Sequence, residues 1–99
     1  MKLWPWSKRS EDPVPIVLYT REGCGLCEEM KEVLARTPLP RAYSLSEVDI
    51  TEDPELLAAY ELSIPVLTIA GRVAFKGRLD ADSLRRKFVR ITKQAEEAR

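Results

Sequence analysis

Hydrophobic positions near the start of the chain predict a strand followed by a helix. The run IVLYT, residues 16–20, is apolar and uncharged, which is typical of a strand buried on both faces of a sheet. The next apolar side chains recur at the spacing of one helical face, at Leu26, Met30, Val33 and Leu34. This helical pattern ends at Thr37-Pro38, because proline cannot continue a helix.

The middle of the chain predicts a weaker strand and a short helix. Residues 43–49 alternate between apolar and polar side chains, but the alternation changes phase near Glu47. Asp53 is a favourable helix N-cap, and Pro54 suits the first helical position. A second helix is therefore expected to run from these residues to about Tyr60.

A β-hairpin is expected next, with Pro65 opening the segment VLTI, residues 66–69. Proline is accepted at the first position of a strand because no ladder hydrogen bond is lost there. Gly71 then turns the chain into a second apolar segment, RVAF at residues 72–75.

The last helix is expected to start at Asp80 or Asp82, either of which can cap it. Its apolar face carries Leu84, Phe88, Ile91 and Ala95. Its other faces carry a run of positive charge that is typical of a solvated helix face: Arg85, Arg86, Lys87, Arg90 and Lys93.

These elements follow the order β-α-β-α-β-β-α. A strand, a helix and a second strand in succession imply a parallel pair joined by a right-handed crossover. The hairpin then adds antiparallel strands, so the predicted fold class is α/β, with a four-stranded mixed sheet and helices on both faces. We expect residues 15–92 to form this domain, residues 1–14 an N-terminal tail, and residues 93–99 a helix end or tail.

Composition narrows the class of protein to which this domain belongs. The chain has 99 residues, enough for one hydrophobic core, and its 16 basic side chains balance 16 acidic ones. This balance argues against nucleic acid or an anionic membrane as a partner, and no apolar stretch approaches the ~20 residues of a transmembrane helix. The N-terminus contains Trp4 and Trp6 but no apolar run typical of a secretory signal, so we expect a cytoplasmic protein. We also expect it to be a monomer.

The only two cysteines, Cys24 and Cys27, lie in TREGCGLCEEM, where the predicted strand gives way to the helix. A thiol attacks as its thiolate, and the free N–H groups at a helix start stabilise that anion. Gly23 and Gly25 leave the backbone of Cys24 unencumbered, and Arg21 is a nearby positive charge. In this arrangement Cys24 can attack a disulfide, and Cys27 can then resolve the mixed disulfide.

Two other interpretations of the cysteine pair remain open. A zinc site normally needs four ligands, and this chain has two cysteines and no histidine, so zinc would require a symmetric dimer. An inert buried pair is the other interpretation, since free cysteine packs as a small hydrophobe. Glu28 and Glu29 would oppose a thiolate at Cys24, and residues 16–20 offer no carboxylate as a buried proton carrier.

The segments LYTREGCGLCEEMKEVL and EVDITEDPELLAAYELSIPVLTIAGRVAFKGRLDADSL resemble the glutaredoxin-like branch of the thioredoxin-fold superfamily, over about residues 16–90. The sequence is most similar to small bacterial glutaredoxin-like proteins with a C-x-L-C-E-E motif. The resemblance implies a thioredoxin/glutaredoxin-like fold and a thiol–disulfide oxidoreductase, with Cys24 as nucleophile and Cys27 as resolving thiol. The implied partners are a disulfide-bearing protein or glutathione and a thiol-reducing system; glutathione is the implied reductant, and no cofactor is tightly bound.

The resemblance also implies residues that bind the substrate. Pro65 would be a cis-proline beside the cysteine pair, and the backbone of Ile64 would pair with the substrate or with glutathione. Arg21 stands where the family has a basic residue that approaches the glutathione carboxylate. Gly77 and Asp80 stand where the family has a glycine pair and an acidic residue for the glutathione amine.

The cysteine motif differs from that of dithiol glutaredoxins, which typically read C-P-Y-C where this chain reads C-G-L-C. The family's paired glycines are reduced to Gly77. Relatives with glycine at the second motif position often bind a [2Fe–2S] cluster between two subunits, through the nucleophilic cysteine and glutathione. Binding or transfer of such a cluster by a dimer bridged at Cys24 is therefore the alternative function that the resemblance implies.

Overall fold

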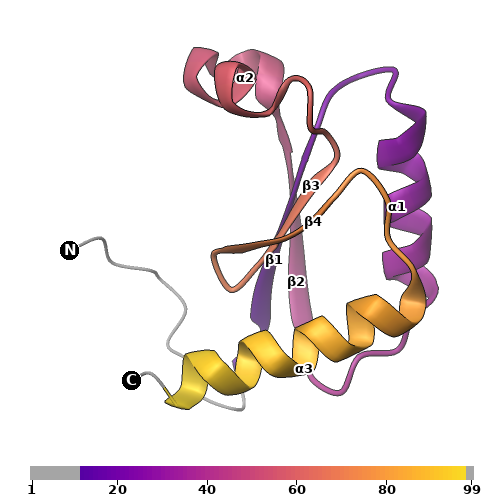
Figure 1. Ribbon diagram of the computed structural model, residues 1–99, viewed down its shortest axis with the longest axis vertical. Helices are drawn as coiled ribbons and strands as arrows, with labels where there is room; N and C mark the ends of the chain where they lie inside the picture. Colours follow the sequence, from indigo (N-terminus) through magenta and orange to yellow (C-terminus); the bar gives the residue numbers. More distant parts are fainter. Residues whose placement is uncertain (1–11, 98–99) are drawn as a thin grey trace.

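Four strands in one sheet and three α-helices make up the fold of residues 12–97, the part of the chain that the computed structural model describes (Figure 1). In chain order the elements are β1 (Val14–Thr20), α1 (Gly25–Arg36), β2 (Tyr43–Asp49), the 3-10 helix η1 (Ile50–Glu52), α2 (Pro54–Tyr60), β3 (Val66–Ile69), β4 (Arg72–Lys76) and α3 (Ala81–Glu97). This order confirms the predicted β-α-β-α-β-β-α succession and the α/β class. Only η1 is an addition.

Strand β1 lies inside the sheet, whose strand order is β2-β1-β3-β4. It pairs in parallel with β2 and antiparallel with β3, where Tyr19 is opposite Val66. Ile16 and Leu18 are fully buried on one face of β1, and the alternate side chains Val17 and Tyr19 are half-buried on the other. Burial from both faces explains why the sequence of β1 is an uninterrupted apolar run.

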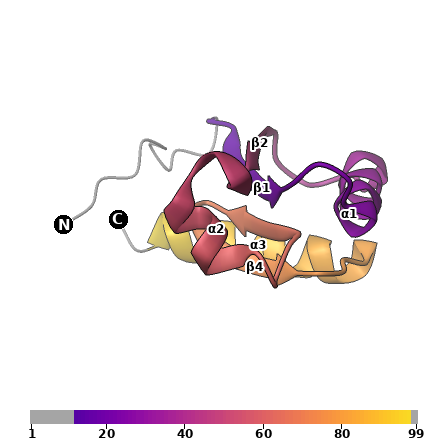
Figure 2. The ribbon, with the colours of Figure 1, turned by 90° about the horizontal axis from the view of Figure 1, so that it is seen from above.

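One face of the sheet is covered by α1 and α3, which share a single core with β1 and β3. Met30 and Leu34 of α1 pack in this core with Phe88 of α3. Helix α2 lies on the other face, where the ring of Tyr60 is 5.0 Å from the ring of Tyr19 between centroids. Figure 2 shows α1 and α2 on opposite sides of the strands, so the prediction of helices on both faces is confirmed.

Helices α2 and α3 each start at an aspartate. Asp53 Oδ1 accepts a hydrogen bond of 2.9 Å from the backbone N–H of Glu55. Asp80 Oδ1 accepts one of 2.9 Å from the N–H of Ser83, and Asp80 Oδ2 accepts one of 2.9 Å from the Ser83 hydroxyl. Of the two candidate caps for α3, Asp80 therefore holds the cap position, and Asp82 lies within the first turn.

Two strands start at residues other than those that the hydrophobic pattern suggests. β1 begins at Val14, two residues before the apolar run, because Val14 already stands opposite Tyr43 in the sheet. β3 begins at Val66, so Pro65 precedes the strand rather than forming its first residue. α3 continues to Glu97, within the segment 93–99 that was expected to be a helix end or a tail.

Part of the N-terminal tail expected from the sequence, residues 1–11 with Trp4 and Trp6, lies outside the described residues. α3 is the longest described helix, with 17 residues, and charged side chains run along it. Across residues 12–97, no helix combines the length and the apolar composition that crossing a membrane requires.

Ile16→Val removes one methyl group from the core, where Ile16 is fully buried. The substitution should lower the free energy of unfolding by about 0.5–1.5 kcal/mol, because the surrounding side chains refill the space only in part. Urea denaturation measures this change. Val89→Ala is the control, because Val89 is 45% exposed on α3; its change should stay within about 0.5 kcal/mol. Equal losses for the two variants would contradict the position of the core.

Asp80→Asn tests the cap of α3 through its pH dependence. The backbone N–H of Ser83 and then its hydroxyl hold the pKa of Asp80 below the ordinary value, because both hydrogen bonds favour the carboxylate. This stabilisation is fully present above the unfolded-state pKa of about 3.9 and is lost as the pH falls through the lower folded-state pKa. Asparagine keeps the acceptor oxygen but does not titrate.

The wild type should therefore lose stability relative to Asp80→Asn as the pH falls below about 4. Thermal unfolding of the two proteins between neutral and acid pH measures the difference. Parallel pH profiles throughout would show that the carboxylate of Asp80 makes no charge-dependent contribution to the cap.

Candidate functional site

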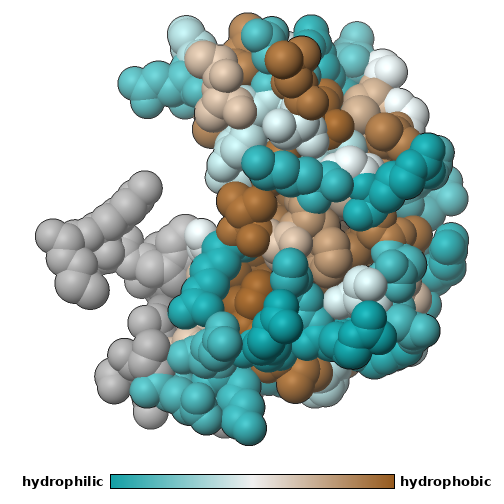
Figure 3. Space-filling model, viewed as in Figure 1, coloured by the Kyte–Doolittle hydropathy of each residue, from teal (hydrophilic) through white to brown (hydrophobic). Residues whose placement is uncertain are grey.

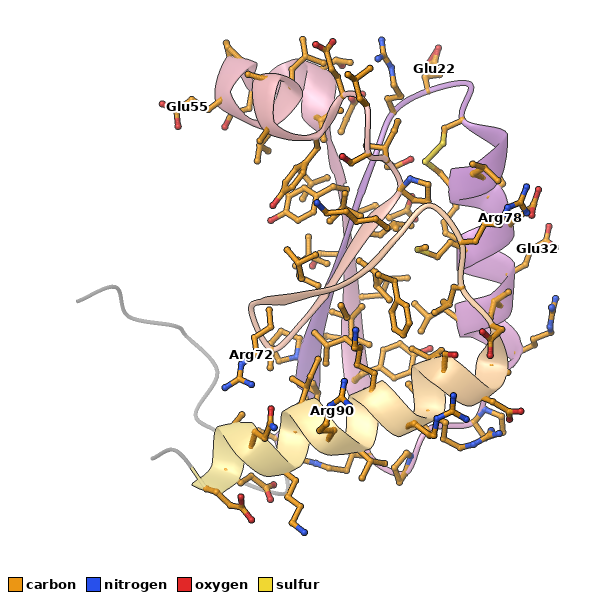
Figure 4. The ribbon with its side chains drawn as sticks, viewed as in Figure 1. Glu22, Glu32, Glu55, Arg72, Arg78 and Arg90 are labelled. Atoms are coloured by element: carbon orange, nitrogen blue, oxygen red, sulfur yellow. A yellow bond between two sulfur atoms is a disulfide. The ribbon has the colours of Figure 1, made fainter. Side chains whose placement is uncertain are left out.

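The two cysteines lie where β1 leads into α1. β1 ends at Thr20, the chain turns through Gly23 with a positive φ of 80°, and α1 starts at Gly25. Cys24 is the N-cap of α1, and its Sγ accepts a hydrogen bond of 3.1 Å from the backbone N–H of Cys27. The pair is joined by a disulfide, with 5.2 Å between the Cα atoms (Figure 4).

The two sulfur-bearing residues differ in their access to solvent. Cys27 is fully buried under the first turn of α1, whereas Cys24 is partly exposed. A molecule that approaches from solvent therefore reaches Cys24 first. The same helix start that positions Cys24 also directs a backbone N–H group at its sulfur, which favours a negative charge there.

The loop before β3 reaches the same end of the sheet. The peptide bond between Ile64 and Pro65 is cis, as the resemblance implies. Because Tyr19 is opposite Val66, Pro65 lies at the end of β1 from which the cysteine loop departs. The backbone N–H of Gly77 donates a hydrogen bond of 2.8 Å to the carbonyl of Pro65, which joins the β4–α3 loop to this place.

A small cavity of about 90 Å³ connects that loop with α1. Its lining comes from two turns of α1 and from the loop after β4: Leu26, Glu29, Met30, Val33, Gly77, Arg78 and Leu79. At its rim, Arg78 Nη1 is 3.3 Å from Glu29 Oε1, and Figure 4 shows Arg78 beside α1. The structure thus brings Gly77 next to both the cis-proline and the helix that carries the cysteines.

Arg21 is exposed beyond the end of β1. Its positive charge lies close enough to affect the carboxyl of Asp49, which stands opposite Thr20 at the end of β2. The hydroxyl and the N–H of Thr51 hold the pKa of Asp49 below its ordinary value, and the positive charge of Arg21 adds to this effect. Among residues 12–97, no hydrogen bond or ion pair joins Arg21 or Asp80 to either cysteine. Asp80 instead caps α3, as described above.

The two acidic side chains after Cys27 form exposed ion pairs with cations, which were not expected from the sequence. Glu28 is 3.0 Å from Lys31, and Glu29 pairs with Arg78. The Glu28–Lys31 pair has the i,i+3 spacing that could have revealed it, whereas Arg78 is 49 residues from Glu29. The opposition to a thiolate that we expected from the two glutamates is therefore reduced.

No carboxylate is buried behind the disulfide in the described part of the chain. The buried polar side chains among residues 12–97 are three threonines, Thr37, Thr68 and Thr92. Within the same residues, no group of three or more His, Cys, Asp or Glu side chains is placed to hold a metal ion.

A family model described as a glutaredoxin-like domain (DUF836) matches residues 15–89, from β1 into α3. The chain belongs to this glutaredoxin-like family. One curated relative is the glutaredoxin-like protein YDR286C homolog of Dictyostelium discoideum, which is 29% identical over 77 residues. The match covers 72% of this chain and 71% of the relative.

Solved structures confirm the thioredoxin/glutaredoxin-like fold. Protein XcR50 from X. campestris is 36% identical with a TM-score of 0.64, covering 76% of this chain and 96% of that one. Protein Ne2328 from Nitrosomonas europaea is 29% identical with a TM-score of 0.59, covering 73% and 87%. Glutaredoxin C1 from Populus tremula x tremuloides, in its holo form, is similar in fold alone: it is 19% identical with a TM-score of 0.55, covering 93% and 86%.

Arg78→Ala should slow alkylation of Cys24 in the reduced glutaredoxin-like protein, because Glu29 then keeps an uncompensated charge near the start of α1. The ion pair is exposed, so the rate with iodoacetamide at neutral pH should fall by only about two- to fivefold. Mass spectrometry of the alkylated cysteine measures the rate. Lys76→Ala removes the same charge from β4 without freeing Glu29 and should change the rate less. Equal effects of the two variants would contradict a specific role of the Arg78–Glu29 pair.

Proposed function

We propose that this protein is a thiol–disulfide oxidoreductase in which Cys24 attacks and Cys27 resolves. The observation that carries the proposal is the asymmetry of the pair: Cys24 is partly exposed at the N-cap of α1, and Cys27 is fully buried one turn away. The family membership supports redox chemistry in general, because the matched residues 15–89 include both cysteines.

The reaction starts from the reduced protein. The Cys24 thiolate attacks one sulfur of a substrate disulfide, so that a Cys24–substrate bond forms and the other substrate sulfur leaves as a thiolate. The thiol of Cys27 then loses its proton to solvent and attacks the sulfur of Cys24. The substrate leaves with two sulfurs reduced, and the protein retains the disulfide between Cys24 and Cys27, a transfer of two electrons.

The start of α1 supports the first step. The N–H of Cys27, which donates to Cys24 Sγ, stabilises the negative charge on that sulfur before it attacks. In the second step the negative charge passes from the Cys27 thiolate to the substrate sulfur that leaves. Because no buried carboxylate lies behind the pair in residues 12–97, the proton of Cys27 exchanges through solvent or through the substrate. The buried position of Cys27 prevents it from competing with Cys24 for substrate.

We assign the substrate-facing surface to Ile64, Pro65 and Gly77 around the cysteine pair. Their support is the hydrogen bond between Gly77 and Pro65 and the position of Pro65 at the end of β1. Arg21 adds positive charge at the neighbouring ends of β1 and β2. In the cytoplasm, glutathione or another thiol-reducing system would return the disulfide to the dithiol, and a disulfide-bearing protein or glutathione disulfide would be the substrate.

The [2Fe–2S] alternative needs more ligands than this chain provides. Two copies of Cys24 and two further thiolates would have to meet at one cluster. The dithiol mechanism requires only the two sulfurs that already lie within bonding distance. For this reason the dithiol function is the one that we propose.

Cys24→Ser should abolish disulfide exchange, and Cys27→Ser should stop the reaction at the mixed disulfide, because the buried resolving thiol is gone. Incubation of each reduced variant with glutathione disulfide, followed by intact-mass measurement, tests both. Cys27→Ser should gain one glutathione, whereas Cys24→Ser should gain none. Full activity of Cys24→Ser, or an adduct on Cys27 in that variant, would overturn the assignment of roles.

A further inference from the structure

A hollow of about 240 Å³ lies between β4 and α3, separate from the cysteine pair. It is lined by Phe75 of β4 and by four residues of α3, Ser83, Arg86, Lys87 and Arg90. Three of these side chains are cations and none is a carboxylate. In Figure 4, Arg90 lies on α3 at the opposite end of the molecule from the disulfide.

Lys87, which lies over the ring of Phe75 in this hollow, is held in place by a neutral backbone group. Lys87 Nζ donates a hydrogen bond of 3.0 Å to the carbonyl of Ala74 and lies 5.1 Å from the centre of the Phe75 ring. These contacts tie α3 to β4 and fix one wall of the hollow. They leave the positive charge of Lys87 uncompensated by a carboxylate within residues 12–97.

The two arginines of the hollow are also available to an anion. Among residues 12–97, the one hydrogen bond of Arg86 goes to the neutral hydroxyl of Ser83, at 3.5 Å, and its charge also acts on the more distant Asp80. Arg90 has no hydrogen bond or ion pair to any described residue. By contrast Arg85, on a different side of α3, is 2.7 Å from Asp82. A guanidinium group with free N–H donors is suited to bind a carboxylate through two hydrogen bonds.

The charges of the chain are separated along its length although its net charge is zero. Residues 43–71 contain six carboxylates and no Lys or Arg, whereas residues 72–94 contain eight Lys or Arg and two carboxylates. In Figure 4, Glu55 lies at one end of the molecule, and Arg72 and Arg90 lie toward the other. In the space-filling view, hydrophilic side chains border hydrophobic ones in the region between α3 and β4 (Figure 3).

We propose that this hollow binds an acidic segment of a partner protein, with carboxylates on Arg86 and Arg90 and an apolar side chain against Phe75. A phosphate group fits less well, because phosphate sites at helices use the free N–H groups of the N-terminus. At α3 the N–H of Ser83 is already bonded to Asp80, and the cationic donors that line the hollow belong to side chains. The open shape of the hollow and its aromatic wall suit a peptide.

The experiment uses the full chain and a fluorescein-labelled peptide of the sequence EELEELEE, with QQLQQLQQ as the uncharged control peptide. The test variant is Arg86→Gln with Arg90→Gln. The matched control variant is Arg85→Gln with Lys93→Gln, which removes two positive charges from the same helix outside the hollow. Fluorescence anisotropy measures affinity, and competition with inorganic phosphate tests the other anion.

The test variant should bind the acidic peptide at least about tenfold more weakly than the wild type, because two charge-assisted contacts are lost. The control variant should lose about twofold or less, since its charges are exposed and screened. The glutamine peptide should bind far more weakly than the acidic one. Disulfide exchange through Cys24 should be unchanged in both variants, so failure here is distinct from failure of the proposed function.

Four results would overturn the proposal. The first two are an equal loss of affinity for the acidic peptide in the two variants and equal binding of the acidic and the glutamine peptide. The other two are no saturable binding of the acidic peptide up to about 1 mM, and its displacement by phosphate at a concentration similar to that of the peptide. Sedimentation velocity addresses a second copy of this chain as the occupant. If the wild type self-associates and the test variant does not, the acidic segment comes from a second copy of the chain, and the proposal of a separate partner protein is overturned as well.

Discussion

The start of α1 depends on a sulfur atom, since Cys24 Sγ accepts the N–H of Cys27 at the position where Ser, Thr or Asp usually caps a helix. This one contact has both a structural and a chemical consequence. It ends the loop from β1 and begins the helix. It also points the partly positive hydrogen of a backbone N–H at Cys24 Sγ, the more exposed of the two sulfurs. The fold around it keeps Cys27 buried and brings the cis-proline loop to the same end of the sheet.

The surroundings of this helix start explain how two neighbouring glutamates are compatible with sulfur chemistry. Glu28 and Glu29 suit the positive end of α1, but both would raise the energy of a thiolate nearby. Lys31 and Arg78 compensate their charges from the same helix and from the β4–α3 loop. The loop that carries Arg78 also carries Gly77, so one segment both lines the small cavity against α1 and supplies the cation that pairs with Glu29.

Local patterns predicted the elements well because the information for them is local. The apolar run of β1, the helical spacing from Leu26 and the Asp53-Pro54 start of α2 are each contained in a few residues. The choice of Asp80 over Asp82 as the cap required the position of Ser83, and the Glu29–Arg78 pair required contacts between residues far apart in the sequence. The cis bond before Pro65 followed from the resemblance alone, since only about 5–6% of X-Pro bonds are cis.

The central claim is that Cys24 and Cys27 form a reversible dithiol. The most direct test equilibrates the protein with glutathione and glutathione disulfide at a series of ratios and measures the intact mass after acid quenching. A reversible dithiol should show a reversible loss of two hydrogens, with a midpoint between roughly −270 and −120 mV, the range of related C-x-x-C proteins. If both thiols stayed reduced and free of adducts across the whole series, the account of this site would be contradicted.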